Sequence, residues 1–290
     1  MTTRAALARG LAGALVLVIA LAVVAAVATA VDSYAFAARL VPAAVMTTVT
    51  IGLLALLLRR DRRPWRFVGV TGSGSFVRGF ALGVGVMAAS TILVFGGATA
   101  LGLVGWGALD PAALALFLVT NTVVALLLEA IPEELALRGY VQSSLGTRFG
   151  RLLTVLLTTA FFLMSPFLLR LAQSVFESLT TGTASWSFTP NGEHPADYYV
   201  LLAVFGVTLS LARWATPSAS IATSIATHLA YLTVARIALS GDADVTGVGL
   251  TLVTPDAILV IPLVLVIAAL GFGALGRRTT TDQAAPPAAV

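Results

Sequence analysis

Long apolar runs divide this chain, and several of them reach the roughly 20 residues that a helix needs to cross a bilayer. Hydrophobic residues make up 58% of the 290 residues and charged residues only 10%, far from the averages of soluble proteins. We therefore predict an all-α fold, a polytopic membrane helix bundle of about eight transmembrane helices. The sequence predicts one transmembrane domain (1–278) and a disordered tail (279–290), with spans at about 8–30, 36–58, 78–104, 112–140, 151–172, 197–214, 219–240 and 257–276.

The composition excludes several kinds of site. The chain has no Cys, which excludes disulfides, thiolate metal sites and cysteine nucleophiles. All 17 positive charges are Arg, and the formal net charge is +4. Because no basic stretch is interleaved with exposed aromatic residues, we attribute this charge to membrane orientation and expect no nucleic acid partner.

Arginines and acidic residues alternate between successive connections of the predicted spans. The positive-inside rule then predicts a multi-pass protein of the plasma membrane with both termini in the cytoplasm. Three arginines lie near outer helix ends, where we expect them to snorkel or to pair with outer acids: Arg39, Arg170 and Arg236. The inner connections contain Arg4, Arg9, Arg59, Arg60, Arg62, Arg63, Arg66, Arg148, Arg151, Arg213, Arg277 and Arg278, and the outer ones contain Asp32, Asp110, Glu177, Glu193, Asp197, Asp242, Asp244 and Asp256.

The first apolar run has two interpretations. Its end, Ala26-Val-Ala-Thr-Ala30, is similar to the small-residue cleavage region of a signal peptide. Its apolar core is longer than that of a typical signal peptide, which favours a retained membrane anchor. Cleavage would leave the orientation of the other spans unchanged.

The connection 59–78 has an amphipathic character, because an arginine cluster is followed by Pro64-Trp65-Arg66-Phe67. We expect it to lie on anionic lipid headgroups, and a substrate-docking surface is the alternative. In the span that follows, Gly79 and Gly83 form a small-xxx-small pair. This spacing favours helix packing inside the bundle over a dimer interface.

The segment Glu129-Ala-Ile-Pro-Glu133-Glu134-Leu-Ala-Leu-Arg138 places acids and an arginine at the inner end of a long apolar helix. Glu134 and Arg138 are four residues apart and share a helical face, so an ordinary ion pair at the membrane interface is one interpretation. A functional cluster is the other, because Glu129 and Glu133 form an unfavourable like-charge pair and apolar sequence continues past the acids. Pro132 is expected to kink the helix just before the pair.

His228 lies about nine residues into its span, a depth of roughly 13 Å at the rise of an α-helix. A neutral, hydrogen-bonded packing residue is one interpretation of a lone buried histidine. A catalytic role is the alternative, because no other span contains a histidine and His228 enters from the same membrane side as the glutamate pair.

The motif Glu133-Glu134-xxx-Arg138-Gly139, in a protein of about eight spans, resembles the CPBP family of intramembrane proteases. This family includes the CAAX prenyl endopeptidases and bacteriocin-processing or immunity relatives. Its pattern is EExxxR on one helix, FxxxH on the next, and HxxxN or HxxxD on a later one. The first motif is intact here, and His228 fits the first position of the third.

The chain departs from the family pattern in the second and third motifs. Phe161-Phe162-Leu-Met-Ser165-Pro166 offers no histidine in either FxxxH register, and Leu232 stands where the third motif has Asn or Asp. The resemblance implies that Glu133 activates water, that Glu134 and Arg138 support it, and that His228 stabilises the oxyanion. The base then lacks its histidine partner, which costs about 10²–10⁴ in rate, and one oxyanion donor is missing, which costs about 10²–10³.

Three functions are compatible with this pattern. The first is a CPBP-type intramembrane endopeptidase of low or no activity. The second is a non-catalytic relative that binds a membrane peptide in a regulatory or immunity role, and the third is a small-solute transporter. The implied partners are the lipid bilayer and a membrane-associated peptide or a prenylated or hydrophobic protein. We expect that no cofactor is required. A zinc ion held by Glu133, Glu134 and His228 is the alternative, although these residues would be a sparse ligand set and His194 is predicted on the opposite side.

Overall fold

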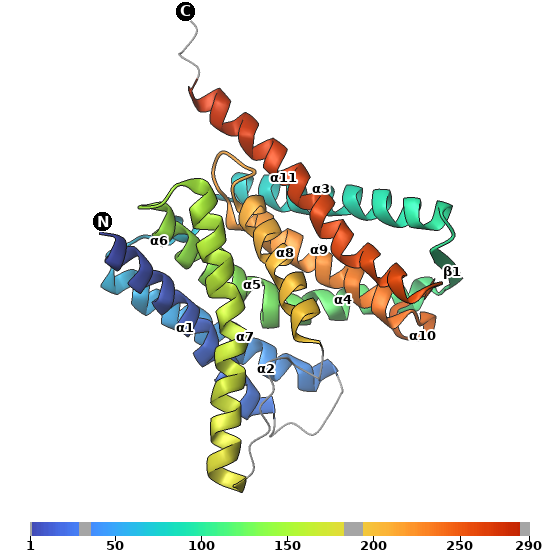
Figure 1. Cartoon of the computed structure of the whole chain (residues 1–290), viewed down its shortest axis with the longest axis horizontal. Coiled ribbons are helices and arrows are strands. Elements are labelled where there is room, and N and C mark those ends of the chain that lie inside the picture. The colour runs from blue at the N-terminus through green and yellow to red at the C-terminus, as the bar shows by residue number, and fades with distance from the viewer. Residues whose placement is uncertain (1, 29–35, 183–193, 285–290) are drawn as a thin grey trace, which may run out of the picture. The chain divides into compact units, whose positions relative to one another are not determined.

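The computed structural model describes residues 2–28, 36–182 and 194–284 (Figure 1). Within these ranges, 8 helices are long and apolar enough to cross a membrane, which confirms the predicted membrane helix bundle. They support a multi-pass integral membrane protein, while the plasma membrane location and the cytoplasmic termini stay predictions. The candidate spans are Thr3–Ala28, Ala38–Arg60, Trp65–Ala100, Pro111–Gly146, Arg151–Leu171, Pro195–Arg213, Ile221–Ser240 and Pro255–Arg277.

The described residues form long helices, several shorter helical elements and two short strands. The long helices are α1 (Thr3–Ala28), α2 (Phe36–Arg60), α3 (Ser73–Ala100), α4 (Pro111–Ala125), α7 (Arg151–Thr181), α8 (Pro195–Arg213), α9 (Ile221–Ser240) and α11 (Val260–Ala284). The shorter helical elements are η1 (Trp65–Val68), η2 (Leu126–Ala130), α5 (Ile131–Glu133), η3 (Glu134–Val141), α6 (Gln142–Gly146), α10 (Ala243–Thr246) and η5 (Pro255–Leu259). The strands are β1 (Val104–Leu109) and β2 (Val248–Leu252).

The helix boundaries differ from the predicted spans in several places. The fourth span continues to Gly146 rather than to residue 140, because Val141 and Leu145 are still buried. α11 continues to Ala284, so helical backbone extends into the predicted tail, of which 285–290 lie outside the described residues. Residues 29–35 also lie outside them, so retention of the first run as a membrane anchor stays a prediction.

The structure adds a two-stranded antiparallel sheet that the sequence did not predict. β1 pairs with β2 in the register Val104↔Leu252 and Trp106↔Leu250. The third span was expected to run to residue 104, but α3 ends at Ala100 and the chain enters β1 instead. Asp110 then starts α4, since its side chain accepts hydrogen bonds from the first backbone N–H groups of that helix.

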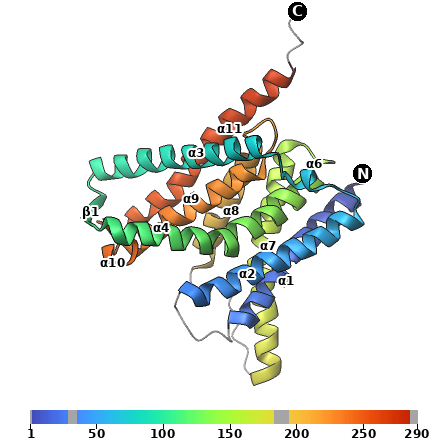
Figure 2. The same cartoon turned by 180° about the vertical axis from the view of Figure 1, so that it is seen from behind.

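The chain divides into two compact units, and each is described by itself. Unit 1 comprises residues 1–68 and 127–207, and unit 2 comprises 69–126 and 208–290. In unit 1, α1 lies beside α2 in both views and also packs on α7 and η3 (Figures 1 and 2). A Cβ at Gly10 would lie 2.7 Å from the Phe161 ring, and one at Gly13 would lie 2.6 Å from Val141. These close approaches make α1 part of the core of unit 1.

In unit 2, α3 packs along α9 and α11 (Figure 2). A Cβ at Gly79 would lie 2.8 Å from Thr223 Oγ1, and one at Gly83 would lie 2.5 Å from the Thr223 carbonyl oxygen and 2.8 Å from Ala226 Cβ. Small residues let two helix backbones approach closely in a membrane. The predicted role of Gly79 and Gly83 in helix packing inside the chain is therefore confirmed.

Candidate functional site

The EExxxR motif lies in a distorted part of the helical run Pro111–Gly146. Pro132 has no N–H to donate, and its ring opposes the carbonyl four residues earlier. The two elements that flank α5, η2 and η3, are both π-helical, so the distortion expected at Pro132 takes the form of wider turns on both sides. π-helical turns within α-helices are frequent at functional sites.

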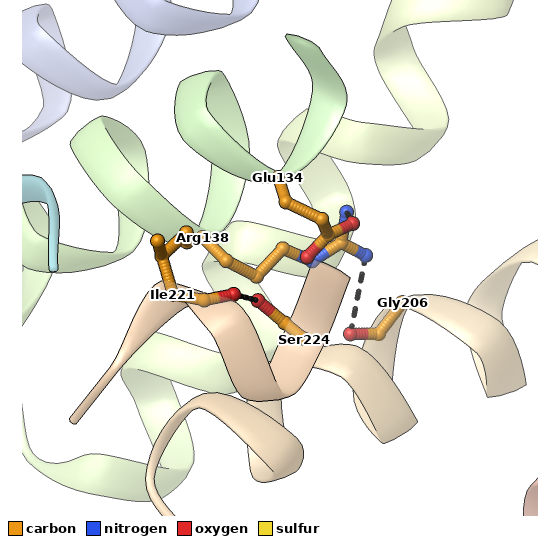
Figure 3. Close-up of polar contacts among 5 residues, drawn as sticks. All are labelled: Glu134, Arg138, Gly206, Ile221 and Ser224. Atoms are coloured by element: carbon orange, nitrogen blue, oxygen red, sulfur yellow. Dashed lines mark hydrogen bonds and ion pairs between the residues drawn. The ribbon is translucent and has the colours of Figure 1, made fainter. Parts of the chain in front are cut away.

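Glu134 and Arg138 form a fully buried ion pair on η3. Both side chains are 0% exposed, and Arg138 Nη1 lies 3.2 Å from Glu134 Oε1. Figure 3 shows the two side chains together, with Arg138 Nη2 donating to the Gly206 carbonyl oxygen at 3.4 Å. Burial of this degree is incompatible with a solvated pair at the membrane interface. A charge buried so completely requires a partner of opposite charge, which Glu134 supplies.

An aromatic ring completes the surroundings of Arg138 in unit 1. The guanidinium carbon lies 4.7 Å from the centroid of the Phe162 ring on α7, a cation–π distance. Phe162 also packs against Phe205 on α8, with ring centroids 6.2 Å apart. The sequence singled out Phe162 only as one register of the second motif. Its contact with the arginine of the first motif was missed, since it depends on how two helices pack.

The adjacent acids Glu133 and Glu134 lie in different environments. Glu134 is buried against Arg138, whereas Glu133 is half-buried on α5 and Glu129 is half-buried on η2. Successive residues on a helix point in directions about 100° apart, which is why neighbours in sequence differ so much in exposure. Glu133 thus keeps part of its side chain at the surface of the described chain, and Glu134 does not.

The second motif presents a serine at the position of the expected histidine. In the register that starts at Phe161, this position is Ser165, which is buried on α7. Its Oγ donates a hydrogen bond to the Phe161 carbonyl oxygen at 3.2 Å. A hydroxyl bonded to its own helix is a common state for serine in membrane helices.

A second polar cluster of unit 1 was not predicted from the sequence. Asp61 Oδ2 lies 2.8 Å from Arg9 Nε and accepts a hydrogen bond from the Tyr140 hydroxyl at 2.6 Å. It therefore joins α1, the end of α2 and η3. One sequence signal could have revealed it, since Asp61 is a single acid within the arginine-rich stretch Arg59–Arg66.

His228 belongs to unit 2, and Glu133, Glu134 and Arg138 belong to unit 1. His228 is 1% exposed on α9, a helix that begins at the N-cap Ser220. Its burial agrees with the predicted depth inside a span. His228 directly follows Thr227 in the sequence. The backbone nitrogen of Thr227 lies 3.2 Å from the position that a Cβ would take at Gly83, so this part of α9 packs closely on α3.

Unit 2 also holds an arginine inside a span. Arg236 on α9 is half-buried, and its Nη1 donates to Asn121 Oδ1 on α4 at 2.5 Å. Asn121 Nδ2 in turn donates to Thr233 Oγ1 at 3.0 Å. The bond to Asn121 adds a neutral amide to the partners of Arg236, while its snorkelling or pairing with an outer acid stays a prediction. This interaction links α9 to α4 by hydrogen bonds.

The residues of the motif do not fit a metal site. Within 2–28, 36–182 and 194–284, no group of three or more His, Asp or Glu side chains is placed to hold a metal ion. Glu134 faces a guanidinium, which occupies the position that a cation would need. His194 is exposed and lies 3.8 Å from Asp197.

Residues 113–234 match the family model described as type II CAAX prenyl endopeptidase Rce1-like. The matched segment contains Glu133, Glu134, Arg138 and His228, together with the two altered motifs. No curated protein matches the chain, and no solved structure matches it. The match confirms, over this segment, the CPBP resemblance predicted from the sequence.

Proposed function

We propose that the Rce1-like segment makes this chain an intramembrane endopeptidase of the CPBP type with a low rate of peptide hydrolysis. The observation that carries the proposal is the different environment of the two adjacent acids. Glu134 is buried against Arg138, whereas Glu133 is half-buried at the inner end of its span, where we expect it to reach water. A carboxylate with access to water is suited to act as a general base.

In the proposed reaction, Glu133 accepts a proton from water while the water oxygen attacks the carbonyl carbon of the scissile peptide bond. His228 donates a hydrogen bond to the oxyanion that forms. The C–N bond then breaks, and the proton held by Glu133 passes to the leaving amine. One water is consumed for each bond cleaved. Glu134 and Arg138 act as positioning residues, because they fix the helix that carries Glu133.

The substrate class follows from the family and from the membrane. The chain offers a bilayer-embedded site, so the substrate is a peptide held at or in the membrane, such as a prenylated or otherwise hydrophobic protein segment. A low rate is expected because Ser165 and Leu232 replace the second-motif histidine and the third-motif Asn or Asp. The loss of either group lowers the reaction rate by about two or more orders of magnitude.

Substitution of Glu133 tests the proposed base. The purified chain in liposomes is given a fluorogenic prenylated peptide, and cleavage is followed over hours. We expect Glu133→Gln to lower the rate by about 10²-fold or more, because an amide accepts no proton. Glu129→Gln is the matched control, since Glu129 is also a half-buried acid on the same helical run. Cleavage that persists unchanged in Glu133→Gln would refute the assignment.

The mechanism requires Glu133 and His228 to reach one peptide bond, and cysteine cross-linking tests this directly. The chain has no cysteine, so Glu133→Cys with His228→Cys would introduce its first two thiols. We expect a short bifunctional thiol reagent to join them within one chain. The control pair is Leu152→Cys with His228→Cys, because Leu152 is 73% exposed. Equal yields from both pairs would contradict a shared site.

A non-catalytic relative is the second candidate, and one observation favours it. The Ser165 hydroxyl is bonded to its own helix, so it does not serve as a partner for a base. Such a protein would bind a membrane peptide in a regulatory or immunity role. Retention of a photoreactive prenylated peptide without any cleavage, lost in Arg138→Met but kept in Glu133→Gln, would support this alternative. No observation on the described residues favours small-solute transport.

A further inference from the structure

The loop Arg59–Arg66 concentrates positive charge on the surface of unit 1. It joins α2 to η1 and has the sequence Arg-Arg-Asp-Arg-Arg-Pro-Trp-Arg. Trp65 is 38% exposed, a side chain typical of the membrane–water interface. All the arginines of this loop are exposed: Arg59, Arg60, Arg62, Arg63 and Arg66.

The single acid of this loop, Asp61, is bound by side chains from outside the loop. Asp61 is bound by Arg9 Nε at 2.8 Å and by the Tyr140 hydroxyl at 2.6 Å, and its side chain is only 12% exposed. Its negative charge is therefore offset by an arginine from α1. The positive charge of the five exposed arginines is therefore not cancelled by Asp61, and it attracts anions.

Arg62 occupies a backbone conformation that would suit glycine. Its φ is 53°, in the left-handed region. The hydrogen bonds Arg63 N–H to Leu58 O and Arg62 N–H to Arg59 O close the end of α2 in the pattern of a Schellman motif. A non-glycine residue is strained there, and strained residues that persist are often functional. The chain thus keeps a positive charge at a position where glycine would fold more easily.

The same loop contacts the helix segment that carries the motif. Besides the bond from Tyr140 to Asp61, the Phe67 ring packs edge-on against the Tyr140 ring at 6.4 Å. A Cβ at Gly139 would lie 3.1 Å from Val68 Cβ, so the backbone of η3 approaches η1 closely. Gly139 directly follows Arg138. The loop and the residues that follow it thus lie in direct contact with the segment of the buried ion pair.

We propose that Arg59–Arg66 is a binding site for the headgroup of an anionic phospholipid, and that lipid bound there stabilises the motif segment Glu134–Val141. Guanidinium groups bind phosphate oxygens in pairs, and clustered arginines beside a span attract anionic headgroups. An exposed Trp65 in the same loop places this cluster at headgroup depth, which favours a lipid over a soluble anion.

Lipid binding to the purified full chain in detergent tests the site. Dioleoylphosphatidylglycerol is titrated and bound lipid is counted by native mass spectrometry, with dioleoylphosphatidylcholine as the neutral comparison. We expect Arg62→Gly to weaken phosphatidylglycerol binding about fivefold, the loss of one arginine near a lipid charge. Its thermal midpoint without lipid should be unchanged or higher, because glycine relieves the positive φ. This separates lost binding from lost folding.

A matched triple variant tests the location. Arg59→Gln/Arg62→Gln/Arg63→Gln should weaken phosphatidylglycerol binding by at least tenfold. The control Arg4→Gln/Arg78→Gln/Arg148→Gln removes the same charge from exposed arginines outside the loop and should bind normally. Equal losses in both triples would overturn the site, as would equal binding of phosphatidylcholine. Displacement of the lipid by millimolar glycerol 3-phosphate would identify a soluble-anion site instead.

The coupling to the motif segment has its own readout. Phosphatidylglycerol should raise the thermal midpoint of the native chain, and Tyr140→Phe should bind the lipid but lose most of that rise, because the bond to Asp61 is gone. An undiminished rise in Tyr140→Phe would refute the coupling. These readouts require no peptide cleavage, so a chain that binds lipid and cleaves nothing would sink the proposed function and leave this inference standing.

Discussion

The two units hold an arginine inside a span in opposite ways. In unit 1, Arg138 is fully buried, and it contacts the carboxylate of Glu134, the carbonyl oxygen of Gly206 and the ring of Phe162. In unit 2, Arg236 is half-buried and donates to the neutral amide of Asn121. The fully buried arginine thus has a carboxylate within contact, and the half-buried one has an amide.

This difference predicts which interactions contribute most to the free energy of unfolding of each unit. Removal of one partner from a buried ion pair leaves an uncompensated charge and is strongly destabilising. Interhelical hydrogen bonds in membranes contribute far less on average, because the unfolded state also finds partners in the lipid interface. The buried ion pair is therefore expected to be the most sensitive single interaction of unit 1, while in unit 2 close helix packing is expected to contribute more than the hydrogen bonds of Arg236 and Asn121.

The largest expected effect comes from breaking the pair in unit 1. Glu134→Gln should lower the free energy of unfolding by about 3–5 kcal/mol, since the Arg138 charge is left buried without a counter-charge. The double variant Glu134→Gln/Arg138→Met should lose much less, because no charge then remains to be buried. Unfolding of the purified chain in mixed micelles, followed by circular dichroism, measures both.

A double variant as unstable as the single one would show that the pair is not the source of the effect. Glu129→Gln serves as the control, since it removes a half-buried acid from the same helical run. Its expected change is within about 1 kcal/mol. The order of stability of these three variants decides whether the loss comes from the missing counter-charge of Arg138 or from the removal of any carboxylate on this helical run.

A middle-sized effect is expected from the packing of unit 2. Gly83→Ala should cost about 1–3 kcal/mol, because the added methyl would lie 2.5 Å from the Thr223 carbonyl oxygen. Gly85→Ala, on the same helix with no atom within 4 Å of its Cβ position, should be neutral or stabilising by up to about 1 kcal/mol. Equal thermal midpoints for the two variants would contradict close packing at Gly83.

The fold was predictable where local sequence decides it. A hydrophobic run of sufficient length specifies a span by itself, which is why about eight spans were expected and eight candidates are found in the part of the chain that the structure describes. The pairing of β1 with β2 joins residues as far apart as Val104 and Leu252, and no local pattern encodes it. These strands are short and rich in glycine, so the sequence resembled a helix end and a loop.

The site was predictable only in part for the same reason. The spacing of Glu134 and Arg138 predicted their contact, because an i,i+4 pair is local. The burial of that pair depends on Phe162 and Gly206, and Gly206 is 68 residues away from Arg138. The different exposure of Glu133 and Glu134 likewise follows from packing around the helix, not from the identity of either residue.

The smallest expected effect completes the comparison between the two arginines. A double-mutant cycle with Asn121→Leu and Arg236→Met should give a coupling energy of about 0.6 kcal/mol, the average for hydrogen bonds between membrane helices. The same cycle with Glu134→Gln and Arg138→Met should give a coupling several times larger, because both charges are buried. Thr233→Val is the control on the neutral side, since it removes the hydroxyl that accepts from Asn121 but leaves Arg236 in place. A coupling in unit 2 as large as that in unit 1 would mean that the amide meets the arginine as well as a carboxylate does. In that case neither the degree of burial nor the choice of partner would set the coupling energy of the two arginines.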